Sequence, residues 1–247
     1  ARISCGNVNI GAMQLERILQ KQGFGTRKEC RALCRGGRVA VNGQPCDEPL
    51  ADIDCAGLVL GVDGVDWPYA EFATLMLHKP AGYECSRNPQ YHPSVLKLLP
   101  APLRARGVQP IGRLDEDTTG LLLLTDDGQL NHRLSSGKRK VPKVYLATTK
   151  HPVDAEQIAR LLAGVVLNGD PAPVAAAAAE IAGERLLRLT VTEGKYHQVK
   201  RMVAAVGNRV VALHREAVGG LALPADLAPG AWRWLAAVDL EKLGNSA

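Results

Sequence analysis

A chain of 247 residues, of which 46% are hydrophobic and 22% charged, can bury one good core and leave room for a small second domain. Its apolar stretches are far shorter than the roughly 20 residues of a membrane span, and we expect no leader, no membrane partner and a cytoplasmic protein. The six cysteines form no Cys-x-x-Cys pair and have no His cluster at zinc spacing, which favours free thiols over a metal site. Residues 1–12 show no periodicity, and we interpret Met13 as the natural start.

Positive charge is concentrated near the N-terminus. The segment 14–38 holds seven basic and two acidic residues, a net charge of +5 that equals the charge of the whole chain. The rest of the chain is therefore neutral. This distribution indicates a small module that binds a polyanion, although a solvated helix pair whose charge only aids solubility would look similar.

Two helices and a hairpin are predicted in this module. Apolar residues recur at i, i+3 and i+4 from Leu15, and the glycines at 23–25 end that helix. Thr26 and Glu29 have the spacing of a capping box, which predicts a second helix that ends at the glycines 36–37. Residues 38–43 predict a short strand and an Asn-Gly turn. The candidate RNA contacts are Arg17, Arg27, Lys28, Arg31, Arg35 and Arg38.

The segment 47–71 is acidic and rich in Gly and Asp, and it favours a linker. We therefore assign residues 13–60 to the basic module, 61–71 to a linker and 72–243 to a larger domain. Strands are predicted over 72–78, 121–124 and 143–148, and a helix over 154–162. The alanine run 175–179 favours a helix by propensity, but nearby prolines and the turn at 182–184 favour a hairpin. A helix over 198–206 ends at Gly207.

The stretch from Gly112 to Gly128 places charged and hydroxyl side chains before an apolar strand. Its D-x-D-x-T pattern occurs in phosphotransferases with an aspartate nucleophile, but in those enzymes an apolar strand leads directly into the first Asp. Glu116 and Asp117 beside Asp115 also suggest the paired carboxylates of a glycoside hydrolase, which lie about 5–9.5 Å apart. An exposed acidic turn capped by Thr118 is the plainest interpretation.

Two resemblances narrow these alternatives. Residues 15–43, L-E-R-I-L-Q-K-Q-G-F-G-T-R-K-E-C-R-A-L-C-R-G-G-R-V-A-V-N-G, resemble the small RNA-binding domain named after the fourth protein of the small ribosomal subunit. Glu16 stands where that family usually has Asp. Six stretches of the larger domain resemble pseudouridine synthases, most closely the small-subunit branch of the Rsu family. They are G-R-L-D, T-G-L-L, T-D-D-G, K-V-Y-L, E-G-K-Y-H-Q-V-K-R-M and V-A-L-H-R-E-A-V-G-G-L. The likeness extends from about Met13 onward.

The second resemblance implies an isomerase that converts one uridine of 16S rRNA to pseudouridine without a cofactor or metal. It implies that Asp115 is the essential carboxylate, that Lys200 pairs with it, and that Tyr145 stacks on the target base. It also implies that Arg113 contacts the RNA backbone or fills the space of the flipped nucleotide. Further candidate RNA contacts are Lys138, Arg139, Lys140 and His197.

The predicted fold class is α+β: a small helix and hairpin module, then a mixed and largely antiparallel sheet flanked by helices, with the active cleft across the sheet. We expect a monomer that acts on 16S rRNA or on a small-subunit assembly intermediate. Two alternatives stay open. One is a large-subunit enzyme of the same family, in which Arg more often replaces Lys200. The other is a ribosome-assembly protein that binds RNA without turnover.

Overall fold

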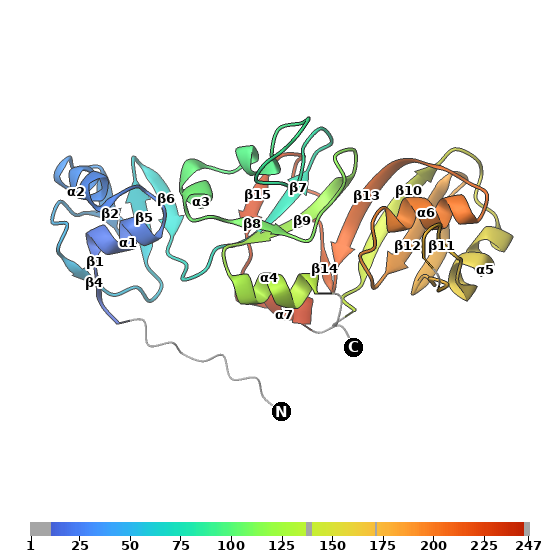
Figure 1. Ribbon diagram of the computed structural model, residues 1–247. Helices are drawn as coiled ribbons and strands as arrows, with labels where there is room; N and C mark the ends of the chain where they lie inside the picture. Colours follow the sequence, from blue (N-terminus) through green and yellow to red (C-terminus); the bar gives the residue numbers. More distant parts are fainter. Residues whose placement is uncertain (1–10, 137–139, 171, 245–247) are drawn as a thin grey trace, which may run out of the picture. The chain divides into compact units, whose positions relative to one another are not determined.

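The computed structural model describes residues 11–136, 140–170 and 172–244. The chain divides into two compact units (Figure 1). Unit 1 contains the N-terminal segment up to residue 73 and a second segment, 99–108. Unit 2 contains residues 74–98 and everything from residue 109 onward. The basic module thus lies in unit 1, and the loop that begins at Gly112 lies in unit 2.

Unit 1 begins with the two predicted helices, α1 (Leu15–Lys21) and α2 (Arg27–Arg35). Leu15, Ile18 and Leu19 are fully buried, as the spacing of apolar residues in α1 predicts. The capping box of α2 is present, because the Thr26 side chain accepts from the Glu29 amide and the Glu29 carboxylate accepts from Thr26. Both helix predictions are therefore confirmed.

The small strands of unit 1 occupy most of the segment that we assigned to a linker. A four-stranded sheet has the order β3-β2-β5-β6, and a separate pair joins β1 to β4. Within 61–71, the end of β5 and all of β6 form a hairpin whose turn, Asp63 and Gly64, has positive φ at both residues. A two-residue turn of this kind matches the twist of paired strands. The bounds are β1 (Met13–Gln14), β2 (Val39–Val41), β3 (Gln44–Pro45), β4 (Asp52–Ile53), β5 (Val59–Val62) and β6 (Val65–Pro68).

A segment distant in sequence completes unit 1. It contains α3 (Ala101–Ala105), and the Arg106 guanidinium that follows donates to Gln22 Oε1 at 2.7 Å and to the Ala70 carbonyl at 3.0 Å. Gly23 has φ +89°, and a Cβ there would lie 2.1 Å from the Pro102 carbonyl oxygen. Only glycine therefore allows the end of α1 to approach this segment.

Unit 2 is built on one mixed sheet whose main path has the order β11-β12-β10-β13-β9-β7-β15. Among the described strands, β9 and β13 form the parallel contact, and all other neighbours are antiparallel. β8 pairs with β9, and β14 pairs with β13. The bounds are β7 (Thr74–Lys79), β8 (Gln109–Ile111), β9 (Thr119–Thr125), β10 (Lys143–Thr149), β11 (Ala178–Gly183), β12 (Leu186–Val191), β13 (Val210–Val218), β14 (Leu221–Ala222) and β15 (Trp232–Trp234).

The helices of unit 2 cover this sheet in two places. Figure 1 shows α4 (Gly128–Ser135) and α7 (Ala237–Gly244) beside the β7, β8 and β9 half, and α5 (Ala155–Ala163) and α6 (Gln198–Ala205) beside the β10, β11 and β12 half. A short 3-10 helix spans Val95–Leu98. The core under α4 and α7 includes Met76, Leu121, Leu123, Leu130 and Val218. The α+β prediction is confirmed, and so is the hairpin after the alanine run, which is β11 and β12.

The junction of β9 and β13 brings the two halves of the sheet together. The parallel contact is short, with His214 opposite Thr119 and Arg215 opposite Gly120. Gly120 has φ +106°, and a Cβ there would lie 2.3 Å from the Arg215 carbonyl oxygen. Glycine is required at this close approach. The loop that carries Asp115 enters β9 at this point.

Candidate active site

The loop between β8 and β9 is held in place by a buried lysine. Lys79, at the end of β7, is 0% exposed, and its ammonium group donates to the carbonyls of Pro80 at 3.1 Å, Glu116 at 2.9 Å and Thr118 at 2.8 Å. The Glu116 carbonyl also accepts from the Gly82 amide. Burial lowers the pKa of Lys79 from its ordinary value. These bonds fix the backbone on both sides of Asp117, and they lie immediately after Asp115.

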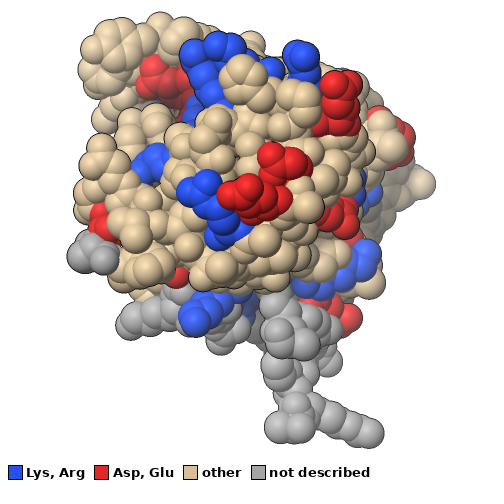
Figure 2. Space-filling view, turned by 90° about the vertical axis from the view of Figure 1, so that its right-hand side faces the viewer, with Lys and Arg blue, Asp and Glu red and all other residues tan. Residues whose placement is uncertain are grey.

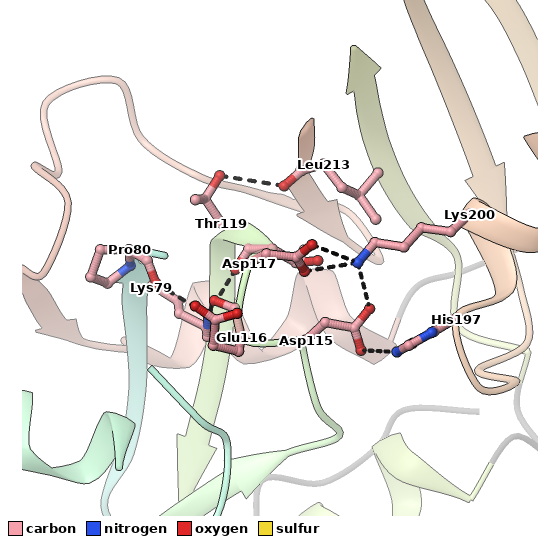
Figure 3. A network of polar contacts seen from close by, with 10 residues as sticks. Lys79, Pro80, Asp115, Glu116, Asp117, Thr119, His197, Lys200 and Leu213 are labelled. Atoms are coloured by element: carbon pink, nitrogen blue, oxygen red, sulfur yellow. Dashed lines mark hydrogen bonds and ion pairs between the residues drawn. The ribbon is translucent and has the colours of Figure 1, made fainter. Parts of the chain in front are cut away.

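Asp115 meets two cationic or ionisable side chains from the start of α6 (Figure 3). Lys200 Nζ lies 3.3 Å from Asp115 Oδ2, and His197 Nε2 lies 3.3 Å from Asp115 Oδ1. His197 precedes α6 with a left-handed backbone, φ +48°. The structure thus brings Asp115 and Lys200 together, as the resemblance implied, and it adds His197 to the other carboxylate oxygen.

Asp117 competes for the same lysine. Lys200 Nζ donates to both Asp117 oxygens, at 2.8 and 2.9 Å. Desolvation opposes the charge on Lys200, but its hydrogen bonds to Asp117 and the Asp115 carboxylate together raise its pKa. Desolvation of Asp117 is likewise outweighed by Lys200, and the pKa of Asp117 falls. Lys200 is therefore a cation shared by two carboxylates.

These side chains open onto a cavity of about 610 Å³, a volume suited to a small ligand such as one nucleotide. Tyr145 lies in the middle of β10, is 9% exposed and lines the same cavity. Tyr196, which is 72% exposed, stacks on His197 with ring centroids 3.8 Å apart at the rim. The same cavity is thus lined by a carboxylate, a cation and an aromatic ring: those of Asp115, Lys200 and Tyr145.

Several cavity residues were not identified from the sequence. Arg215 is opposite Tyr145 on the neighbouring strand and is 3% exposed. Lys143 lies two residues before Tyr145 on β10 and also lines the cavity. Thr118 is a further lining residue, and its buried hydroxyl lacks a hydrogen-bond partner among the described residues. Arg215 could have been identified as a candidate because it is a cation within the strand 210–218, whose residues alternate between the two faces of the sheet. Lys79 could have been identified in the same way, because it is a cation at the end of an apolar strand.

The candidate RNA contacts fall into three groups. Arg113 is exposed and lines the cavity. Lys140 is exposed as well, whereas Lys138 and Arg139 lie outside the described residues. In unit 1, Arg31 binds the buried carboxylate of Glu16, and Arg38 binds Asp63 at 2.6 Å. The four other candidates in unit 1 are exposed and have no carboxylate within 4.0 Å among the described residues: Arg17, Arg27, Lys28 and Arg35.

No cluster of three or more His, Cys, Asp or Glu side chains within the described ranges is arranged to hold a metal ion. None of the helices in the same ranges is long and apolar enough to cross a membrane. The five cysteines in the described chain are free thiols, and burial raises the pKa of Cys85, which lines the cavity.

The sheet and the Asp115 loop define the class to which this protein belongs. Residues 73–205 match the RNA pseudouridylate synthase family, and residues 13–49 match the S4 domain. The chain belongs to the RNA pseudouridylate synthase family and is an isomerase with an N-terminal S4 domain. A crystal structure of a pseudouridylate synthase is similar, with a TM-score of 0.67 and 36% identity, over 94% of this chain and 99% of that one.

Two curated relatives cover almost the whole chain. The ribosomal small subunit pseudouridine synthase A of Escherichia coli K12 is 47% identical over 228 residues, which are 90% of this chain and 95% of the relative. An RNA pseudouridine synthase of Bacillus subtilis 168 is 41% identical over 238 residues, 94% of this chain and 99% of the relative. The phosphotransferase and glycoside hydrolase alternatives are thereby set aside.

Proposed function

We propose that this protein converts a uridine of the 16S rRNA of the small ribosomal subunit to pseudouridine. The observation that carries the proposal is the convergence of Asp115, Lys200 and Tyr145 on one cavity in a chain of this family. The names of its small-subunit relatives favour this RNA over that of the large subunit. A protein that only binds RNA has no need of an ion-paired carboxylate facing a nucleotide-sized cavity.

The reaction rearranges atoms that the substrate already contains. The bond from sugar C1′ to base N1 breaks, the base turns, and a new bond joins C1′ to C5. The C5 hydrogen leaves as a proton, and N1 gains one, so the product has the composition of uridine. Asp115 provides the one carboxylate that this chemistry uses, either by attacking the substrate covalently or by removing a sugar proton to form a glycal.

Lys200 and Tyr145 have different tasks in this proposal. Lys200 orients Asp115, because its ammonium group lies 3.3 Å from Asp115 Oδ2 and attracts the carboxylate. Tyr145 stacks on the extruded uracil. Arg113, which is exposed at the cavity, contacts the RNA backbone or fills the gap that the uridine leaves. Extrusion costs a few kcal/mol, which contacts to the RNA offset.

The S4 domain supplies such contacts. Its exposed, unpaired basic residues are suited to phosphates, which set affinity and register but not sequence. The end of unit 2 seen in Figure 2 offers a different surface, on which basic side chains lie among acidic ones. We infer that phosphate binding depends mainly on Arg17, Arg27, Lys28 and Arg35 of α1 and α2, and that the substrate is 16S rRNA or an assembly intermediate of the small subunit.

The test is to incubate the protein with partly assembled small-subunit particles that lack pseudouridine, and to map pseudouridine in the RNA. We expect one new pseudouridine in 16S rRNA and none after treatment with Asp115→Asn. Asp226→Asn, which changes an exposed carboxylate outside the cavity, should act like the wild type. Naked 16S transcript in parallel shows whether assembly creates the target shape.

No pseudouridine with any 16S substrate would refute the proposed substrate. Modification of 23S rRNA instead would assign the protein to the large subunit. Full activity of Asp115→Asn would refute the proposed chemistry, since no other carboxylate in the cavity contacts both Lys200 and His197 among the described side chains.

A further inference from the structure

The cavity that Asp115 lines also contains a buried cation that the proposed reaction has not used. Arg215 is 97% buried, and its Nε donates to the Leu121 carbonyl at 2.7 Å. Its Nη1 lies 3.5 Å from the Tyr145 hydroxyl, and its guanidinium carbon lies 6.0 Å from the centre of the Tyr145 ring. Among the described residues, no carboxylate lies within 4.0 Å of it. The guanidinium is thus buried without an ion-pair partner among the described residues.

A second cation stands beside it. Lys143 is also on β10, two residues before Tyr145, and its ammonium group donates to the Val141 carbonyl at 3.1 Å. Burial, and to a lesser extent the charge of Arg215, lowers the pKa of Lys143. Both side chains line the cavity. Burying charge without a counter-ion is costly, so the buried Arg215 beside the half-buried Lys143 indicates a place where a ligand brings negative charge.

A purely structural role does not account for Arg215. One backbone carbonyl satisfies Nε alone, whereas a guanidinium carries five N–H donors. The other two arginines on strands of this sheet have carboxylate partners: Arg188 binds Glu180 and Glu216, and Arg233 lies 3.8 Å from Asp239. Arg215 instead presents its remaining donors at the edge of the ring on which the target base is proposed to stack.

We propose that Arg215 binds the uracil of the target nucleotide and stabilises the negative charge that the ring acquires when the glycosidic bond breaks. This inference rests on the proposed function. When the C1′–N1 bond breaks, its electron pair leaves with the base, and the charge spreads over N1 and the two carbonyl oxygens. A fixed cation in a site shielded from water stabilises such developing charge without having to reorganise. The charge disappears when the electron pair at C5 forms the new bond to C1′ and the C5 proton is lost to solvent as N1 takes one up.

A binding experiment tests this without turnover. 5-Nitrouracil loses a ring proton near neutral pH and mimics the uracil anion, whereas uracil stays neutral. The dissociation constants of both are measured at pH 8 for the wild type, Arg215→Met, Arg215→Lys and the control Arg188→Met. We expect the wild type and Arg188→Met to prefer 5-nitrouracil by about tenfold, the value of one charge-assisted hydrogen bond. Arg215→Met should lose that preference, and Arg215→Lys should keep part of it.

Catalysis gives a second readout. In single turnover with saturating enzyme, Arg215→Met should slow pseudouridine formation about 100-fold or more, with RNA affinity unchanged within about threefold. An undiminished anion preference in Arg215→Met, or no anion preference in the wild type, would overturn the inference. If Arg215→Met does not fold, Arg215→Lys decides, because a preference equal to that of the wild type contradicts the role of the guanidinium fork. An Arg215-dependent preference in a protein that makes no pseudouridine would refute the proposed function but not the anion site.

Discussion

Replacing Lys79 with Met removes the ammonium group that holds the Asp115 loop and keeps nearly the same side-chain volume. The substitution takes one hydrogen bond from each of the three carbonyls, those of Pro80, Glu116 and Thr118. It leaves the apolar packing of β7 unchanged. The expected result is a folded but less stable protein whose catalytic loop is loosened, with a large loss of pseudouridine formation.

The magnitude follows from two opposing effects. Hydrogen bonds to a charged group contribute about 1.5–3 kcal/mol each, so three of them contribute about 4.5–9 kcal/mol. Against this, the variant no longer buries an ammonium ion, which regains several kcal/mol of desolvation. The free energy of unfolding should therefore fall by about 3 kcal/mol. With an m-value of about 2 kcal/mol per molar urea, the unfolding midpoint should fall by about 1.5 M.

Urea unfolding and amide hydrogen exchange measure the two parts of this prediction. Exchange should accelerate at the Thr118 amide, which donates to Asp115, and at Gly82, which donates to Glu116. Lys97→Met, an exposed lysine of the same unit, is the control and should change neither quantity. If Lys79→Met unfolds at the wild-type urea concentration with unchanged exchange in the loop, the ammonium group does not hold the loop.

The lowered pKa of Lys79 adds a test with a definite sign. In the unfolded chain a lysine titrates near its ordinary value of about 10.4, so between the lowered folded pKa and 10.4 the unfolded state binds more protons. The stability of the wild type relative to Lys79→Met should therefore rise with pH across that window. A stability difference that stays constant from pH 7 to 10.5 would contradict the burial of a charged Lys79.

Three further substitutions separate the roles of neighbouring residues. Asp117→Asn should cost less than about 1 kcal/mol of stability, because the Asp117 side chain is 62% exposed, and it should reduce activity less than about tenfold. A loss of activity as complete as that of Asp115→Asn would instead make Asp117 essential. Gly120→Ala should destabilise by about 3 kcal/mol or more in urea unfolding, since its Cβ would overlap the Arg215 backbone; wild-type stability would show that β9 and β13 can separate without cost. Thr118→Val should be neutral or stabilising by up to about 1 kcal/mol, and a clear loss of stability would reveal a hidden partner of its hydroxyl.

Much of the fold followed from local patterns. The capping box of α2 and the apolar stripes of α1 and α6 depend on residues three or four apart, and these predictions were confirmed. The predicted linker failed for a physical reason. Gly and Asp are frequent there because very short strands need tight turns, and the Asp63-Gly64 pair between valines is itself a hairpin signal.

The site could be predicted only where a motif identified it. Asp115, Tyr145 and Lys200 were indicated by resemblance, and the structure brings them to one cavity. Lys79 and Arg215 act over separations of 37 and 94 residues, from Lys79 to Glu116 and from Arg215 to Leu121. Contacts of this kind depend on which strands become neighbours, and no local spacing encodes them. The ionic contact of Asp117 with Lys200, 83 residues apart, was missed for the same reason.

The discontinuity of unit 1 bears on the order in which the protein is made. Its N-terminal part, through residue 73, is synthesised well before the segment 99–108 that supplies α3 and Arg106. Because the ribosome adds residues from the N-terminus, the contacts between these ten residues and the N-terminal part can form only after the first strand of unit 2 has been made. A gene fragment that stops at residue 73 would lack the contacts of Arg106 with Gln22 and Ala70, so an N-terminal fragment that is meant to keep these contacts has to include residues 99–108.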